Sequence, residues 1–198
     1  MKKYAGHKLI VYVGAIHRLR GCLNMIKAMK YVRAEVPNAK LLLIGQITDP
    51  EFLCEIEQLL IEEGLKECVE FLGVVPYPKL HTYLSICDIA LWLYLPYAQS
   101  LRTMGSSKLF LYMRAGLPII ASNLPGIKLL LKNINCSILV DPTNVEQIAS
   151  AIVELLRKPK LARQLGENGR RAVAERFNWE FEEKEILRAY ASITRAGA

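Results

Sequence analysis

The sequence predicts one α/β domain with a doubly wound, mostly parallel sheet, followed by C-terminal helices. Short apolar runs alternate with longer segments of helical period as far as Asp141. The apolar runs lack strict polar alternation, which is typical of strands buried on both faces. A length of 198 residues, with 52% hydrophobic and 23% charged residues, fits a single globular domain with one core.

Six segments rich in Val, Ile and Leu are the expected strands, at 8–15, 39–45, 69–74, 88–95, 118–122 and 137–141. The expected helices between them lie at 21–35, 50–64, 78–87, 107–115 and 126–132. The first helix carries the apolar stripe Leu23, Ile26, Met29 and Val32. Pro37 closes that helix, and Gly64 and Gly116 stand where helix C-termini favour a left-handed residue. Repeated strand–helix–strand units imply right-handed crossovers and parallel strands.

Beyond Asp141 the pattern predicts helices alone. The first, at 144–156, has a cap at Asn144 and one apolar face, made of Val145, Ile148, Ile152 and Leu155. The next two lie at about 160–176 and from about 180 onward, separated by Asn178 and Trp179. The last helix has an apolar stripe formed by Phe181, Ile186, Leu187 and Tyr190. This stripe either packs on the sheet of the same chain or reaches toward another domain.

Composition narrows the classes of function. The longest apolar runs, such as 89–95, are far shorter than the roughly 20 residues that cross a bilayer, and the N-terminus has no apolar signal segment, so we expect a cytoplasmic protein. Five scattered cysteines without a CxxC pair indicate reduced, buried thiols, with no disulfide framework and no metal site. The net charge of +7 suits a polyphosphate ligand, peripheral association with the cytoplasmic membrane surface, or an ordinary basic protein. The sequence has no basic stripe with interleaved aromatic residues, so it does not predict nucleic-acid binding.

Ligands of parallel sheets sit beyond the carboxyl ends of the strands, which directs attention to the loops there. The loop from Thr103 through Gly105, Ser106 and Ser107 leads into a helix that starts near Lys108. Gly105 permits close approach, and the amides of Ser106 and Ser107 would face an anion with the helix dipole behind them. Alternatively, one of the two serines only caps the helix.

The loop after the first strand adds cations to the same edge of the sheet. It contains Gly14, His17, Arg18, Arg20 and Gly21. Gly14 allows a tight turn, with or without a ligand. Arg18, and Arg102 elsewhere, either assist anion binding or are surface charge, and His17 either bonds a sugar or phosphate or is solvated.

Four segments resemble the retaining GT-B glycosyltransferases often called family 4, or glycosyl transferases group 1. Val11 to Gly14, followed by Arg20-Gly21, is similar to the family's glycine turn and "KG" segment. Residues 69–73 (VEFLG) and 83–90 resemble its "F-x-G" strand and "Y…AD" segment. Residues 107–122 (SKLFLYMRAGLPIIAS) resemble its "K-L-x-E-x-M-A-x-G-x-P-V-V-A-S" pattern, and 177–179 (FNW) its closing pattern.

The resemblance implies the Rossmann-like, donor-binding C-terminal half of such an enzyme, with the acceptor-binding N-terminal half having no counterpart in residues 1–198. The donor would be a nucleotide-sugar such as a UDP- or GDP-sugar, with no other cofactor and no metal. Arg20 would contact the diphosphate together with Gly14, Lys108 and the amides of residues 105–107. The base would lie beside Val75 and Tyr77, unless Tyr77 packs at the start of its own helix.

The same resemblance exposes three departures from the family pattern. The family's Glu-x7-Glu pair, which serves the sugar and the ribose, falls on Thr103 and Leu111, and Ala15 stands where an Arg is usual. Leucine accepts no hydrogen bond, so losing the ribose acceptor weakens donor binding on the order of 10- to 100-fold.

Two hypotheses of function remain open from the sequence. One is a glycosyltransferase domain, inactive alone, that an N-terminal domain completes in cis or in trans. The other is a non-catalytic binding or scaffold module of the same fold. A flavodoxin-like or receiver domain is disfavoured because the strand ends at 45–46 and 95–96 lack an acidic cluster.

Overall fold

The protein is built on a six-stranded sheet in the order β3-β2-β1-β4-β5-β6, and every pair of neighbouring strands is parallel. The computed structural model describes residues 2–97 and 107–196. The strands are β1 (Lys8–Val13), β2 (Ala39–Ile44), β3 (Val69–Gly73), β4 (Ile89–Trp92), β5 (Ile119–Ser122) and β6 (Ser137–Val140). The predicted fold class is confirmed, and the sheet is wholly parallel.

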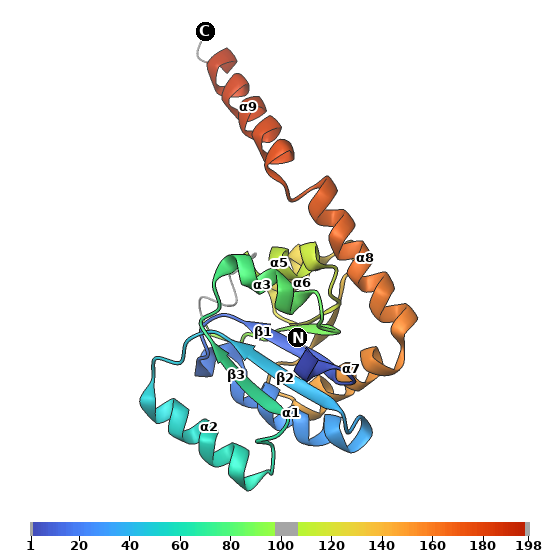
Figure 1. Cartoon of the computed structure of the whole chain (residues 1–198). Coiled ribbons are helices and arrows are strands. Elements are labelled where there is room, and N and C mark those ends of the chain that lie inside the picture. Colours follow the sequence, from blue (N-terminus) through green and yellow to red (C-terminus); the bar gives the residue numbers. More distant parts are fainter. Residues whose placement is uncertain (1, 98–106, 197–198) are drawn as a thin grey trace.

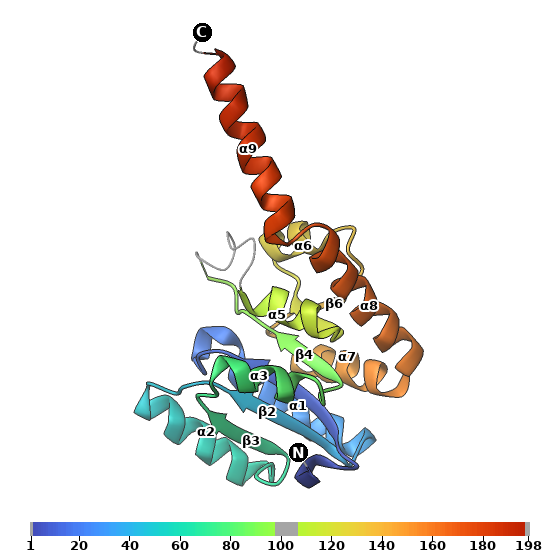
Figure 2. The ribbon, with the colours of Figure 1, turned by 45° about the horizontal axis from the view of Figure 1, so that its top comes forward.

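Helices cover both faces of this sheet (Figures 1 and 2). One face packs against α1 (Cys22–Glu35), α2 (Pro50–Glu62) and α7 (Val145–Arg157). The opposite face packs against α3 (Tyr77–Leu84), α5 (Ser107–Ala115) and α6 (Pro125–Leu131). Successive residues of a strand therefore enter different cores: Ile10 and Tyr12 lie in the first, and Leu9 and Val11 in the second.

Two short 3-10 helices complete the N-terminal half, η1 (Lys2–Tyr4) and η2 (Arg18–Arg20). The residues predicted to begin or end helices are confirmed. The Asn144 side chain accepts a hydrogen bond from the Gln147 amide at the start of α7, and Gly64 and Gly116 have φ of 64° and 72°. The predicted strands 8–15 and 88–95 are too long, because the chain leaves the ladder at Gly14 and after Trp92 to form the loops of the carboxyl edge.

Of the last two helices, α8 (Pro159–Glu175) packs against the domain and α9 (Trp179–Ala196) leads away from it (Figure 1). Phe181, Ile186, Leu187 and Tyr190 are 40%, 43%, 61% and 68% exposed. Their stripe therefore does not pack on the sheet of this chain. Within the part of the chain that the structure describes, no helix is long and apolar enough to cross a membrane.

All five cysteines are free. Cys22, Cys68 and Cys136 are buried and Cys87 is partly buried, but Cys54 is exposed. The prediction of buried thiols is wrong for Cys54, because it lies on the solvent side of α2 while Phe52 and Ile56 of that helix point into the core.

Candidate functional site

The strand order of the sheet reverses at the pair β1 and β4. β1 pairs with β2 on one side and with β4 on the other. In open parallel sheets, ligands bind outside the carboxyl ends of the strands at this switch point. Gly14 follows β1 and Tyr94 follows β4, so both lie at the carboxyl edge of the sheet beside this switch point.

Glycines allow the ends of β1 and β2 to approach each other closely. Gly14 has a φ of 134° and Gly45 a φ of 152°, and a Cβ added to Gly45 would lie 1.9 Å from the Gly14 carbonyl oxygen. The Gly14 amide donates to the Ile44 carbonyl (2.8 Å) and the Ile16 amide to the Gln46 carbonyl (2.9 Å). The loop after β1 is thereby held over the sheet edge.

The Lys108 amine lies directly against Gly14. A Cβ added to Gly14 would be 2.7 Å from Lys108 Nζ, so any larger residue would displace the amine. One further contact fixes α5 in this position: the Tyr112 hydroxyl, fully buried one turn beyond Lys108, accepts a hydrogen bond from the Val13 amide at 2.7 Å. The hydrogen bond between Tyr112 and Val13 therefore holds α5, and with it Lys108, against the end of β1.

Arg20 and Lys108 both lie close to the ring of Tyr94. The Arg20 guanidinium carbon lies 4.3 Å from the ring centroid and Lys108 Nζ 5.9 Å from it. Tyr94 is buried, its amide donates to the Ser122 hydroxyl (2.7 Å), and that hydroxyl donates to the Tyr94 carbonyl (2.8 Å). The structure therefore brings together Gly14, Arg20 and Lys108, which the sequence singled out, around an aromatic platform that it did not single out.

The uncharged polar groups below these cations keep their protons at neutral pH. Burial raises the pKa of the Cys22 thiol to about 11, although Arg20 and Lys108 act in the opposite direction. Burial likewise raises the pKa of the Tyr12 and Tyr112 hydroxyls well above its usual value. These groups contribute no negative charge that would neutralise Arg20 and Lys108.

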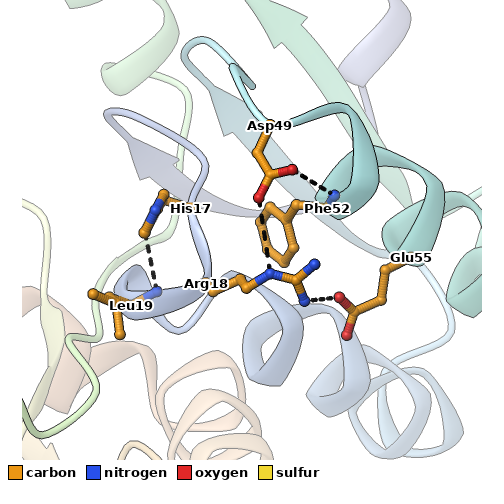
Figure 3. A network of polar contacts seen from close by, with 6 residues as sticks. All are labelled: His17, Arg18, Leu19, Asp49, Phe52 and Glu55. Atoms are coloured by element: carbon orange, nitrogen blue, oxygen red, sulfur yellow. Dashed lines mark hydrogen bonds and ion pairs between the residues drawn. The ribbon is translucent and has the colours of Figure 1, made fainter.

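Arg18 does not share this arrangement (Figure 3). Its guanidinium pairs with Glu55, lies 3.9 Å from the Asp49 carboxylate, and stacks 4.8 Å from the centroid of the Phe52 ring. All three partners belong to the start of α2, where Asp49 also caps the helix by accepting from the Phe52 amide at 3.1 Å. The arrangement supports the alternative in which Arg18 is structural surface charge.

His17 caps η2. Its Nδ1 accepts a hydrogen bond from the Leu19 amide at 3.2 Å, and its side chain is exposed (Figure 3). The Leu19 carbonyl in turn accepts from the Leu95 amide at 3.0 Å, which ties η2 to the segment after β4. His17 therefore has a structural role in shaping the loop that presents Arg20.

One residue expected at the ribose and one expected at the base line the same cleft. Leu111 and Tyr77 border a cleft of about 240 Å³ between α3 and α5, together with His81 and Arg114. Tyr77 is 71% exposed at the first position of α3, whereas Val75 is partly buried against the core. Sequence reasoning did not single out His81 or Arg114, because their approach to Leu111 depends on how α3 and α5 pack in the folded chain.

The helix α5 begins at Ser107, as predicted. The Ser107 side chain is exposed. Arg102, Thr103, Gly105 and Ser106 lie outside the described residues. Among residues 2–97 and 107–196, no three His, Cys, Asp or Glu side chains gather in a way that would hold a metal ion.

Comparison with protein families shows which family the chain belongs to. Residues 2–172 match the family model described as glycosyl transferases group 1. The chain belongs to this family. Its fold is that of the C-terminal half of a GT-B glycosyltransferase: a C-terminal domain of the group 1 glycosyl transferase LpcC of Francisella tularensis superposes with a TM-score of 0.70, at 21% identity, over 87% of this chain and 87% of that one.

Longer relatives of the family match over part of their length only. N-acetyl-alpha-D-glucosaminyl L-malate synthase of Bacillus anthracis is 27% identical over 186 residues, which are 94% of this chain and 45% of that protein. Anabaena HepE in complex with UDP superposes with a TM-score of 0.83 at 18% identity, over 96% of this chain and 50% of that one. The chain thus spans about half the length of the relatives that it matches.

Proposed function

We propose that this group 1 glycosyltransferase chain is a donor-binding domain, which binds a nucleoside-diphosphate sugar and takes part in retaining glycosyl transfer once an N-terminal domain completes it in cis or in trans. The observation that carries the proposal is the pairing of Arg20 and Lys108 over Tyr94 beside Gly14. Two cations held 4.3 Å and 5.9 Å from one ring centroid at the switch point suit the two phosphates of a diphosphate.

The proposed role of these cations is electrostatic. Breaking the bond between the sugar and the diphosphate leaves negative charge on the departing diphosphate, and positioned cations lower the energy of that transition state. Arg20 contributes planar donors that fit phosphate oxygens, and Lys108 contributes a point charge beside the Gly14 backbone. The amides of residues 105–107 would add donors at the start of α5.

A second candidate is a non-catalytic binding module, and Leu111 is the observation that favours it. The side chain at this position, which the family resemblance assigns to the ribose, is apolar and packs against the core below α3 and α5. A module that binds phosphate groups but has lost donor affinity would keep Arg20 and Lys108 and tolerate Leu111.

Isothermal titration calorimetry of the full chain with UDP, UDP-glucose, GDP-mannose and ADP-glucose tests the proposal. We expect heat of binding for at least one of them, and the double variant Arg20→Ala, Lys108→Ala to lower that affinity on the order of 100- to 10,000-fold, because each charge-assisted contact is worth roughly 1.5–3 kcal/mol. Arg18→Ala is the matched control, since its charge is paired with α2, and it should bind within about threefold of the parent chain. A folded chain that gives no heat with any of these ligands would favour the non-catalytic module.

A further inference from the structure

Charge is divided unevenly between the two sides of the molecule. Residues 41–70, which contain α2, hold eight acidic residues and one basic residue, Lys66. Residues 71–140, which contain α3, α5 and α6, hold six basic residues and one acidic residue, Asp88. Asp88 is paired with Lys8 at 3.2 Å. Arg102 lies outside the described residues, and the other five basic residues lie on or directly after α3, α5 and α6, so this face is basic and the proposed donor site accounts for only part of its charge.

A polar hollow of about 250 Å³ lies between the α6–β6 connection and the end of α8. Arg171 and Arg176 reach it from α8 and its end, and Asn133 and Asn135 from the connection, both with left-handed φ of 71° and 52°. The connection precedes β6, so the hollow lies at the amino ends of the strands, opposite the edge that bears Arg20 and Lys108. One acidic residue, Glu175, also lines it.

An apolar groove of about 600 Å³ adjoins the hollow between α6 and the edge strand β6. Leu129, Leu131 and Leu139 line it, with Lys128 and Lys132 beside them. Asn133 and Asn135 line both the groove and the hollow, so the two spaces share a wall. Leu129 is 62% exposed between two exposed lysines, a pattern that suits a boundary between charged headgroups and hydrocarbon.

We propose that this face, made of the hollow and the groove, is a docking surface for anionic phospholipids of a membrane. The phosphate headgroup would lie against Arg171, Arg176 and the two asparagines, and the side chain of Leu129 would enter the edge of the acyl region. Lys128, Lys132, Arg171 and Arg176 take part in none of the ion pairs found among the described residues, so their charge is available to an external anion. The proposal does not depend on donor binding at the opposite edge of the sheet.

Co-sedimentation of the full chain with sucrose-loaded vesicles tests this surface. We expect binding to phosphatidylcholine vesicles that contain phosphatidylglycerol, weakening as salt is added, and little binding to phosphatidylcholine alone. Lys128→Ala, Lys132→Ala should lower the partition coefficient roughly 30-fold, since each cation near an anionic surface contributes about fivefold. Leu129→Asn should lower it about tenfold without changing the charge.

The matched control is Lys27→Ala, Lys66→Ala, which removes two exposed lysines from the opposite side of the molecule. It should change vesicle binding less than twofold. Equal losses in the two double variants would overturn the proposal, as would equal binding to both kinds of vesicle. Binding of glycerophosphate measured by calorimetry without any binding to vesicles would also overturn it, and would identify the hollow as a site for a free phosphate ester.

Discussion

Leu111 is a residue at which the proposed donor site departs from the family pattern. It lies one turn inside α5, three residues beyond Lys108, and borders the same cleft as Tyr77. The cation pair needs nothing from this position, because Lys108 is held by Gly14 and by the bond from Val13 to Tyr112. The proposed site therefore keeps its two cations, while Leu111, the position expected at the ribose, is apolar.

Restoring a carboxylate at this position should strengthen donor binding. We expect Leu111→Glu to raise the affinity for the preferred nucleotide-sugar on the order of 10- to 100-fold, since a hydrogen bond to a charged acceptor is worth roughly 1.5–3 kcal/mol. Calorimetry with the nucleotide and with its 2′,3′-dideoxy analogue measures the effect. Leu111→Met is the control, and it should leave affinity unchanged. A gain that is equal for the dideoxy analogue would show that the carboxylate does not act on the ribose.

At the level of single residues, the sequence predicted Gly14, Arg20 and Lys108 because each belongs to a short motif at the end of a strand or the start of a helix. Tyr94 and the partners of Arg18 were not predictable in the same way. Arg18 finds Asp49 and Glu55 across the sheet edge, and Arg20 finds Tyr94 after β4, so these pairings depend on strand order. Motif spacing carries no information about which loops become neighbours.

At the level of elements, the proposed site depends on α5, because this helix carries Lys108. The helix α8 packs against the end of α5. Gly166 of α8 lies against the end of α5, where a Cβ added to it would be 2.0 Å from the Gly116 carbonyl oxygen. Arg170 Nη2 donates to the Ala115 carbonyl at 3.1 Å, and so satisfies one of the last carbonyls of α5. The two helices are thus in close backbone contact at the amino edge of the sheet.

Gly166→Ala should destabilise the domain by about 1–3 kcal/mol, because the methyl group would collide with backbone that cannot rotate away. Urea unfolding followed by circular dichroism measures the free energy of unfolding. Gly169→Ala is the matched control in the same helix, since its Cβ would meet Cys136 Cβ at 3.3 Å and Met113 Cα at 3.4 Å. It should cost less, because these contacts are longer than the 2.0 Å contact at Gly166, while the preference of the helix for Ala over Gly, about 1 kcal/mol, applies to both variants. Equal stability of the two variants would contradict this account of how α8 meets α5.

Helices and strands were predictable from the sequence because hydrophobic period and capping residues act locally. Asn144 begins its helix, and Gly64 and Gly116 follow the ends of theirs, where the sequence indicates. The strand ends were less predictable, since apolar residues continue past the ladder at Tyr94 and Leu95, and only pairing with neighbouring strands decides where a strand stops. The predicted 88–95 strand fails for this reason.

At the level of the whole molecule, surface chemistry is separated by region. The cation pair lies at the carboxyl edge, the basic hollow at the amino edge, and the acidic surface on α2. The helix α9 extends beyond all three (Figure 2). The sequence left open where the apolar stripe of this helix packs, because its period alone does not tell whether a surface in the same chain will cover it.

The exposed stripe on α9 should make the chain self-associate. Ile186, Leu187 and Tyr190 share one side of α9 and leave an exposed apolar strip in water, and burying it against a second copy releases free energy in proportion to the area covered. Equilibrium sedimentation should show a weight-average mass that rises above 22.4 kDa with concentration.

The double variant Ile186→Lys, Leu187→Lys should keep the chain monomeric by placing charge within the strip. Ile61→Lys, which changes an equally exposed residue on α2 (60% against 61% for Leu187), should associate as the parent chain does. A parent chain that stays monomeric at the highest concentration reached would show that the strip is too small, or too well hydrated, to drive association.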